Sequence, residues 1–154
     1  MNEHQLYDTL RDDVKLCKSV RLKKLSGTAM SAGLPDLLVQ TKHGNFLVEL
    51  KAIEPPKRRD TIVYPWRLCS ALQQRELRDT WNLNGQAALA VGFQFGPEKY
   101  LQFFTPTGED IEWLPYGNLL GCVRRVRGQG WDFLGIETAL LQSALSFLKG
   151  KLQA

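Results

Sequence analysis

The feature that most constrains the fold is a pair of apolar runs separated by a short polar break. The runs are 36–41 (DLLVQT) and 45–52 (NFLVELKA), and Lys42-His43-Gly44 lies between them. β-Favouring residues on either side of a glycine-containing break are typical of an antiparallel β-hairpin. Pairing across this break predicts that one end of the hairpin collects Asp36, Glu49 and Lys51.

Glu49 and Lys51 are unusual because the segment around them otherwise has the composition of a buried strand. Side chains two positions apart share a face of a strand, and these two charges alternate with Val48, Leu50 and Ala52. Charged groups in apolar surroundings need a partner or a metal ion. Two carboxylates suit Mg²⁺ or Mn²⁺, and a nearby lysine can position a water or stabilise charge on a phosphate. The pattern indicates phosphodiester hydrolysis; the alternative is an exposed edge on which Glu49 and Lys51 pair across strands.

Apolar periodicity places helices at both ends of the chain and one in the middle. We expect helices over 3–17 and 67–83, the second stopped by Asn84-Gly85, and a closing helix marked by residues from Ile136 to Leu148. Further strands are predicted at 20–25, 86–95 and 99–105, with loops at Ser26–Gly33 and 53–65. The order α-β-β-β-α-β-β-α predicts one α/β domain over 1–154, with a mixed central sheet flanked by helices.

Composition narrows the possible partners and the compartment. The 154 residues carry a net charge of +4 and a pI of about 9.1, which favours an anionic partner without identifying it. Three scattered cysteines suit reduced thiols, and two histidines leave few partners for a zinc site or a Ser-His-Asp triad. No apolar run approaches the roughly 20 residues of a membrane helix, and the N-terminus does not resemble a signal peptide. We therefore expect a cytoplasmic protein with no membrane partner.

Basic residues are clustered along the chain, and each cluster is either a solvated face or a phosphate contact. The clusters are Lys15, Lys18, Arg21, Lys23 and Lys24; Lys57, Arg58 and Arg59; and Arg124, Arg125 and Arg127. We expect the second and third to bind DNA, the third as a flexible basic arm that continues into Gly128-Gln129-Gly130-Trp131. The tryptophans Trp66, Trp113 and Trp131 are expected to be core or loop anchors rather than base-stacking platforms.

Two short motifs resemble a known class of nucleases. Gly33-Leu34-Pro35-Asp36 and Glu49-Leu50-Lys51, with Glu49 13 positions after Asp36, resemble the PD-(D/E)xK nuclease superfamily. The resemblance is closest to VRR-NUC (virus-type replication-repair nuclease) domains and then to archaeal-type Holliday junction resolvases. As in VRR-NUC domains, a helical glutamine, Gln74, stands 11 positions before a glycine, Gly85, and an apolar strand follows. The resemblance covers about residues 3–95 and implies a restriction-endonuclease-like core.

This resemblance implies a role for each residue of the second motif and for the aspartate of the first. Asp36, Glu49 and the backbone carbonyl of Leu50 would hold Mg²⁺ or Mn²⁺. Lys51 would act on the attacking water or on the scissile phosphate.

Two further site residues are implied by the resemblance. One is a supporting glutamine at the start of the middle helix, which is Gln74, with Gln73 as the alternative. The other is an acidic residue from the first helix, which is Glu3, with Asp12 and Asp13 as rivals.

The resemblance also implies a substrate and an assembly. It indicates a metal-dependent endodeoxyribonuclease that acts on branched DNA as a homodimer, and it makes a phage or mobile-element origin possible. The alternatives are a restriction-like or nicking nuclease without junction preference and a catalytically silent DNA-binding module. Gln74 follows Lys51 by 23 positions, more than is usual in the family, so the intervening segment is a candidate substrate-contacting insertion.

Overall fold

A single mixed sheet organises the molecule. The computed structural model describes residues 1–25 and 33–153, and its seven strands lie in the sheet in their chain order. Every neighbouring pair is antiparallel except β3 and β4, which are parallel. The strands are β1 (Arg21–Lys24), β2 (Leu37–Thr41), β3 (Gly44–Ala52), β4 (Ala87–Phe95), β5 (Glu98–Phe104), β6 (Val123–Val126) and β7 (Gly130–Trp131). The predicted α/β class with a mixed sheet is confirmed.

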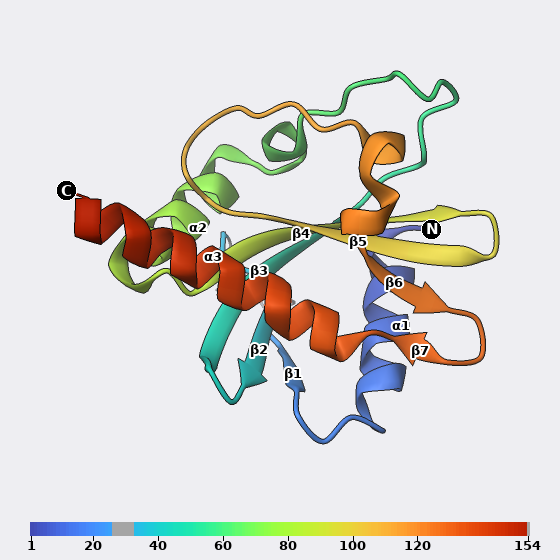
Figure 1. Cartoon of the computed structure of the whole chain (residues 1–154), viewed down its shortest axis with the longest axis horizontal. Helices are drawn as coiled ribbons and strands as arrows, with labels where there is room; N and C mark the ends of the chain where they lie inside the picture. The colour runs from blue at the N-terminus through green and yellow to red at the C-terminus, as the bar shows by residue number, and fades with distance from the viewer. Residues whose placement is uncertain (26–32, 154) are drawn as a thin grey trace.

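Helices cover both faces of the sheet (Figure 1). The α-helices are α1 (Glu3–Val14), α2 (Ala71–Asn84) and α3 (Phe133–Gln153), and the short 3₁₀ helices are η1 (Pro65–Leu68) and η2 (Pro115–Gly121). Leu6 of α1 and Leu140 of α3 belong to one buried core, whereas Leu77 of α2 belongs to a second core on the opposite face. Among the described residues, no helix is long and apolar enough to cross a membrane.

The hairpin predicted from the two apolar runs is confirmed. β2 and β3 pair with Leu37 opposite Val48 and Thr41 opposite Gly44, so Lys42 and His43 form the turn. In this register Asp36, which directly precedes β2, lies at the level of Glu49, and opposed residues of an antiparallel pair project to the same face. The hairpin thus brings the two carboxylates together at one end.

The connection from β3 to β4 is a crossover that carries α2 over the second face. Parallel neighbours require such a crossover because the end of the first strand and the start of the second lie at opposite ends of the strand pair. α2 begins at Ala71 rather than at the predicted residue 67, because Ser70 caps it and residues 65–68 form η1 instead. It ends at Gly85, whose φ of 75° is the left-handed conformation that favours glycine.

The C-terminal third corrects the sequence analysis. Arg124 and Arg125 lie in β6, which pairs with both β5 and β7, so the prediction of a flexible basic arm was wrong. Two arginines in a four-residue strand break the alternation by which such a strand would be recognised. The predicted loop Ser26–Gly33 falls, apart from Gly33, outside the described residues.

Candidate active site

The backbone before β2 fixes the position of Asp36. Gly33 has a φ of +79°, and a Cβ built there would lie 2.4 Å from Cγ of Leu72. Both the backbone conformation and the lack of space therefore favour glycine at this turn. Pro35 is buried, and the next residue places its side chain against β3. Oδ2 of Asp36 accepts a hydrogen bond of 2.9 Å from the backbone N–H of Leu50. This bond ties the aspartate of the first motif to the middle of the second.

Glu49 is a buried carboxylate, with only 1% of its surface exposed. It lies opposite Leu89 of β4, on the face covered by α2. Oε1 accepts a 3.1 Å hydrogen bond from Nε2 of Gln73, whereas Oε2 is buried without a partner among the described residues. Burial, together with the adjacent Asp36 carboxyl, raises the pKa of Glu49 to about 8. An acidic group with half its hydrogen-bonding capacity unfilled is costly to bury.

Lys51 links Glu49 to the first helix. Its Nζ lies 3.9 Å from Oε1 of Glu49 and 3.9 Å from Oε1 of Glu3. The lysine side chain is 15% exposed and that of Glu3 is 51% exposed, so the ammonium group lies between a buried carboxylate and the solvent. This charge opposes the rise in the pKa of Glu49 without cancelling it.

A pocket of about 180 Å³ opens beside these residues. Asp36, Leu50 and Glu3, three of the four residues that the resemblance implies for the metal site, line it, whereas Glu49 and Lys51 do not. The pocket also has a basic and aromatic side that the sequence analysis did not assign, formed by His4, Tyr7 and Lys24. Only the helical spacing of Glu3 and Tyr7, which puts them on one face of α1, pointed to the aromatic member.

The donors present fit a hard divalent cation that keeps several of its waters. No group of three or more His, Cys, Asp or Glu side chains within residues 1–25 and 33–153 has the geometry of a complete metal site. The carboxylates of Asp36 and Glu49 are nevertheless adjacent here. Oε2 of Glu49, which has no partner among the described residues, can accept a hydrogen bond or bind a cation. Mg²⁺ typically takes one or two carboxylates and fills its remaining positions with water and substrate oxygens. Asp36, Glu49 and the Leu50 carbonyl therefore form a chemically suitable, incomplete set.

The glutamine beside Glu49 is Gln73, the alternative that the sequence analysis left open. Its Oε1 accepts from the backbone N–H of Ser70 at 2.9 Å, and this capping box turns its Nε2 toward Glu49. The structure does not bring Gln74 to the carboxylates. Nε2 of Gln74 donates instead to the carbonyl oxygens of Trp66 and Cys69, at 2.8 and 3.1 Å.

The three candidate carboxylates of the first helix, Glu3, Asp12 and Asp13, also lie in different surroundings. Glu3 lines the pocket and approaches Lys51, whereas Asp13 lies against β6 and β7 and Asp12 pairs with Arg11 and Lys15. Of the three candidates, the structure brings only Glu3 to the site.

The predicted DNA-binding clusters differ in how free their charges are. The exposed cations on the segment after β3 are Lys57, Arg58 and Arg59. Arg127, which follows β6, is also exposed. Arg124 is paired with Glu98 and Arg125 with Asp13. These two arginines hold β6 against its neighbours, and their charges are already matched. The three tryptophans named above are 5–7% exposed, as expected of core anchors.

Comparisons with known proteins find similarity to solved structures but not to a known family. No protein-family model and no curated protein matches the sequence. The chain is similar to Hjc of Archaeoglobus fulgidus, described as a Holliday junction resolvase from an archaeal hyperthermophile. The similarity has a TM-score of 0.46 at 16% sequence identity, and it covers 80% of this chain and 99% of that one.

Proposed function

We propose that this protein is a divalent-metal-dependent endodeoxyribonuclease. Its active site, which hydrolyses phosphodiester bonds of DNA, is formed by Asp36, Glu49 and Lys51. The observation that carries the proposal is the under-satisfied Glu49. A carboxylate that is 1% exposed, touches a second carboxylate and leaves one oxygen unpartnered among the described residues has no evident structural purpose. The adjacent Asp36 lines an open pocket, and Nζ of Lys51 lies 3.9 Å from Oε1 of Glu49. Metal-assisted hydrolysis of a phosphate uses such a set of groups.

Each residue of the site has a separate task in this proposal. Asp36 and Glu49 would hold Mg²⁺ or Mn²⁺, with the Leu50 carbonyl as a third oxygen. When bound, the ion supplies a Lewis acid and a water of lowered pKa. Lys51, held within 3.9 Å of Glu49, orients the attacking water or neutralises charge that develops on the phosphate. Gln73 fixes the Glu49 carboxylate through Oε1.

The sequence motifs support branched DNA as the substrate. Gly33-Leu34-Pro35-Asp36 with Glu49-Leu50-Lys51 resembles nucleases of junction and repair DNA, and the net charge of +4 suits a polyanion. The exposed cations Lys57, Arg58 and Arg59 are candidates for phosphate contacts, and Lys24 in the pocket wall is a further one. A nicking or linear-duplex nuclease is the main alternative, because the site chemistry is the same for both.

We also propose that two copies of the chain pair through α3. Its outer face carries leucines spaced by seven, four, three and four positions, the spacing by which helices pack against one another. They are Leu134, Leu141, Leu145, Leu148 and Leu152, of which Leu134 is 71% and Leu152 is 86% exposed. An isologous pair would cover this stripe on both copies. Sedimentation should give a dimer for the wild type and for Leu120→Glu on η2, and a monomer for Leu145→Glu with Leu148→Glu.

The cleavage assay uses a four-way junction, a linear duplex and single strands, each with Mg²⁺ or with EDTA. Asp36→Asn removes the charge while its amide oxygen can still accept from Leu50 N–H, so the backbone contact survives. Asp12→Asn is the matched control, because Asp12 is exposed and, within the described part of the chain, its ion pairs are with Arg11 and Lys15. We expect cleavage by the wild type and the control, and none by Asp36→Asn or in EDTA. Equal cleavage by all three proteins would refute the site, and preference for the linear duplex would refute the junction substrate.

A further inference from the structure

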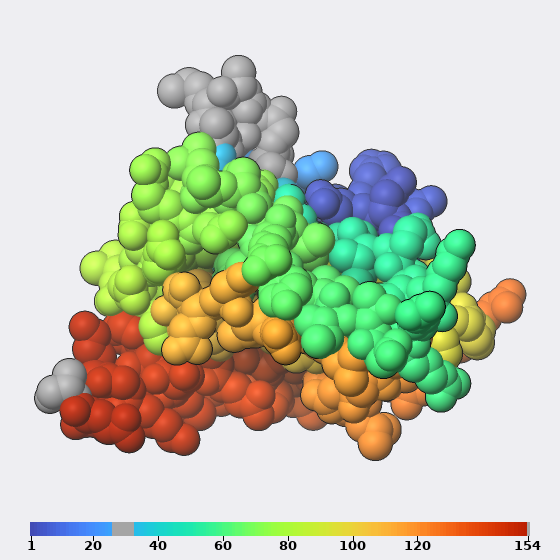
Figure 2. Space-filling view, turned by 90° about the horizontal axis from the view of Figure 1, so that it is seen from above, coloured from blue at the N-terminus to red at the C-terminus, as the bar shows by residue number. Residues whose placement is uncertain are grey.

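A polar pocket lies between two turns at one side of the sheet. It has a volume of about 290 Å³, and the turns around it join β4 to β5 and β6 to β7. Figure 2 shows the yellow turn after β4 and the orange turn after β6 at the same side of the molecule, as does Figure 1. The pocket, which we call the Lys99 pocket, has in its lining Gln94, Lys99, Arg125 and Arg127.

The register of the sheet brings three of these side chains to one face. Lys99 of β5 lies opposite both Gln94 of β4 and Arg125 of β6. Opposed residues of antiparallel strands project to the same face of a sheet. Val123, two positions from Arg125, packs in the core that includes Leu6 of α1. The pocket therefore opens on the face that α1 covers.

The lining of the Lys99 pocket carries positive charge that the described residues do not fully balance. Arg125 donates to Asp13 of α1, so these two charges match each other. Burial would raise the pKa of Asp13, but the bonds and charge of Arg125 lower it, and Lys99 lies close enough to lower it further. The ion pairs found around the pocket in the described part of the chain include neither Lys99 nor Arg127.

The carboxylates next to the pocket in the sequence have other partners. Glu98 pairs with Arg124, and both project to the opposite face because side chains alternate along a strand. Asp12 of α1 is exposed and pairs with Arg11 and Lys15. Two cations that share a pocket repel each other unless an anion lies between them. The pocket is therefore suited to an anionic ligand.

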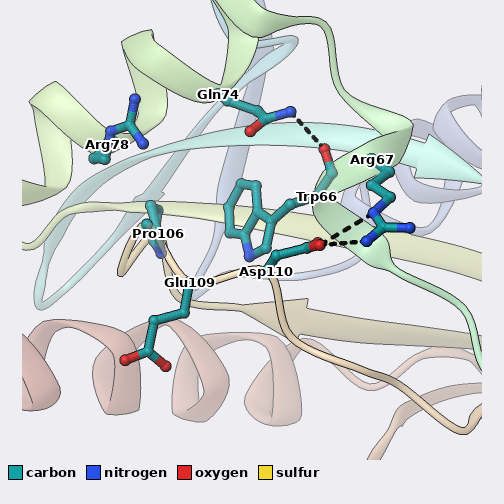
Figure 3. Close-up of a pocket in the computed structure, with 8 residues that line it drawn as sticks. Trp66, Arg67, Gln74, Arg78, Pro106, Glu109 and Asp110 are labelled. Carbon is teal, nitrogen blue, oxygen red and sulfur yellow. Dashed lines mark hydrogen bonds and ion pairs between the residues drawn. The ribbon is translucent and has the colours of Figure 1, made fainter.

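The pocket at the start of α2 has the opposite arrangement of charge (Figure 3). There Arg67 donates to Asp110 at 3.1 and 2.6 Å, and Arg78 shares the lining with Glu109. An anion in that pocket would meet as much negative charge as positive charge. Among the described residues that line the Lys99 pocket, by contrast, there is no aspartate or glutamate.

The side chains of the Lys99 pocket suit a phosphate group. The guanidinium of an arginine can donate to two phosphate oxygens at once, and a lysine adds a compact positive charge. Gln94 donates to the carbonyl of Gly96 at 3.2 Å, which leaves it a second amide hydrogen for another oxygen. Arg127 is exposed and Lys99 is half-buried, so a phosphate that belongs to a larger molecule can reach both from the solvent.

The first helix sets the separation between this pocket and the carboxylates. Glu3 of α1 lines the pocket beside Asp36. Asp13, ten positions later on the same helix, holds Arg125 in the wall of the Lys99 pocket. At 1.5 Å per residue these two helix positions are about 15 Å apart, which is the length of about four base pairs of duplex DNA. An arm of DNA that is cut at Asp36 is therefore long enough to reach the Lys99 pocket.

We propose that the Lys99 pocket binds a backbone phosphate of the DNA a few base pairs outside the cut, with Lys99 and Arg127 as its ligands. This inference rests on the proposed function. A phosphate contact carries no sequence information, but it fixes the register and the orientation of the duplex on the protein. The pocket would thus hold one arm of the substrate at a second point while the scissile phosphate lies at the carboxylates.

The first experiment measures DNA binding in EDTA over a range of salt concentrations. The pocket variant combines Lys99→Gln with Arg127→Gln. Losing two phosphate contacts should weaken binding about tenfold at low salt and reduce the slope of log Kd against log salt by about two. The matched control combines Lys42→Gln with Lys149→Gln, which removes the same charge from exposed positions outside the pocket lining. The control should keep the wild-type slope, and an equal change in both variants would overturn the pocket.

A second measurement locates the contact on the wild-type protein itself. Each phosphate of the DNA is replaced in turn by an uncharged methylphosphonate. A linkage about four nucleotides outside the cut should weaken binding severalfold for the wild type and for the control, and should have no effect on the pocket variant. A scan that finds no sensitive linkage outside the cut would overturn the inference.

Inorganic phosphate tests the other source of the same chemical group. A Tm that rises in phosphate over chloride at equal ionic strength for the wild type alone, with the salt slope for DNA unchanged in the pocket variant, would make this a site for free phosphate and overturn the proposal. DNA binding and Asp36-dependent cleavage with an unchanged slope would overturn the pocket and leave the nuclease intact. Absence of DNA binding and cleavage by the wild type would overturn the proposed function as well.

Discussion

Two clusters of charge in this molecule use the same residue types in opposite ways. In the Asp13 cluster, formed by Asp13, Arg125 and Trp131, the aspartate accepts from Nε of Arg125 at 2.7 Å, from Nη2 at 3.0 Å and from the Trp131 N–H at 2.8 Å. In the carboxylate site, formed by Asp36, Glu49 and Lys51, one oxygen of Glu49 is buried without a described partner. The Asp13 cluster joins segments 112 residues apart, and its acceptor oxygens have partners. The carboxylate site lies on one hairpin, and one of its acceptor oxygens has no partner among the described residues.

The pKa values of the two clusters move in opposite directions. Burial would raise the pKa of Asp13, but the hydrogen bonds from Arg125 and Trp131 and the arginine charge lower it below its ordinary value. Burial and the Asp36 carboxyl raise that of Glu49 to about 8, and the charge of Lys51 does not compensate. A satisfied cluster serves the fold, whereas a cluster that leaves a buried carboxylate oxygen without a described partner is suited to bind a ligand. Substitutions in each cluster separate these two uses.

The largest expected effect is the loss of cleavage in Glu49→Gln. The amide cannot hold a cation as a carboxylate does, so we expect activity to fall at least about a thousandfold. The metal-free variant should unfold at the same urea concentration as the wild type or a higher one, because a buried acid with one oxygen left without a described partner has been replaced by a neutral group.

Asp13→Asn is the matched variant in the other cluster. It should keep its cleavage activity and lose stability, since its amide leaves Arg125 without a full counter-charge. If Glu49→Gln destabilised the protein and Asp13→Asn removed activity, the assignment of the two clusters would be reversed.

The second prediction concerns the binding of the metal itself. Mg²⁺ or Mn²⁺ at a hundredfold excess over its Kd should stabilise the wild type by about 2.7 kcal/mol, because it binds only the folded state. Calorimetry should show this rise in Tm for the wild type and for Asp13→Asn, and none for Asp36→Asn. An equal rise in all three would place the ion elsewhere on the protein.

The hairpin could be predicted from the sequence because its signal is local. Val48, Leu50 and Ala52 alternate with two charges, and a glycine-containing break sets the turn, so pairing brings Asp36 to Glu49. The structural role of Asp13 and Arg125 could not be predicted from the sequence. Their contact forms only because β6 and β7 pack against α1, and the two residues are 112 positions apart. No sequence spacing records that contact, and Arg125 therefore looked like a free DNA-binding cation.

The choice between Gln73 and Gln74 was also beyond the sequence. The two are neighbours, and which of them faces β3 depends on where α2 begins. That start is set by Ser70, whose hydroxyl accepts from the Gln73 N–H at 3.1 Å. A start displaced by one residue would rotate the helix by about 100° and place Gln74 where Gln73 now donates to Glu49.

The third prediction measures the Asp13 cluster by pH. The pKa of Asp13 is lowered from its ordinary value of 3.8, so its contribution to stability is present above that pH and is lost as the pH falls through the folded-state pKa. Asp13→Asn should lower the free energy of unfolding by about 2 kcal/mol at pH 7, the scale of a charged hydrogen bond in a partly buried setting. Urea titrations should show the difference between wild type and variant shrinking below about pH 4. A difference that is independent of pH would mean that the charge of Asp13 does not matter.

The smallest expected effect separates the support of Glu49 from the capping of α2. Gln73→Ala removes both the bond to Glu49 and one half of the capping box, whereas Ser70→Ala removes the other half and does not touch Glu49. Both variants should lose about 1 kcal/mol of stability, the usual contribution of a helix cap. Only Gln73→Ala should also lower kcat, by about fivefold to tenfold, because the Glu49 carboxylate is then free to turn. Equal kcat in the two variants would show that the capping box alone positions this end of α2, and that the under-satisfied carboxylate is held by Asp36 and Lys51.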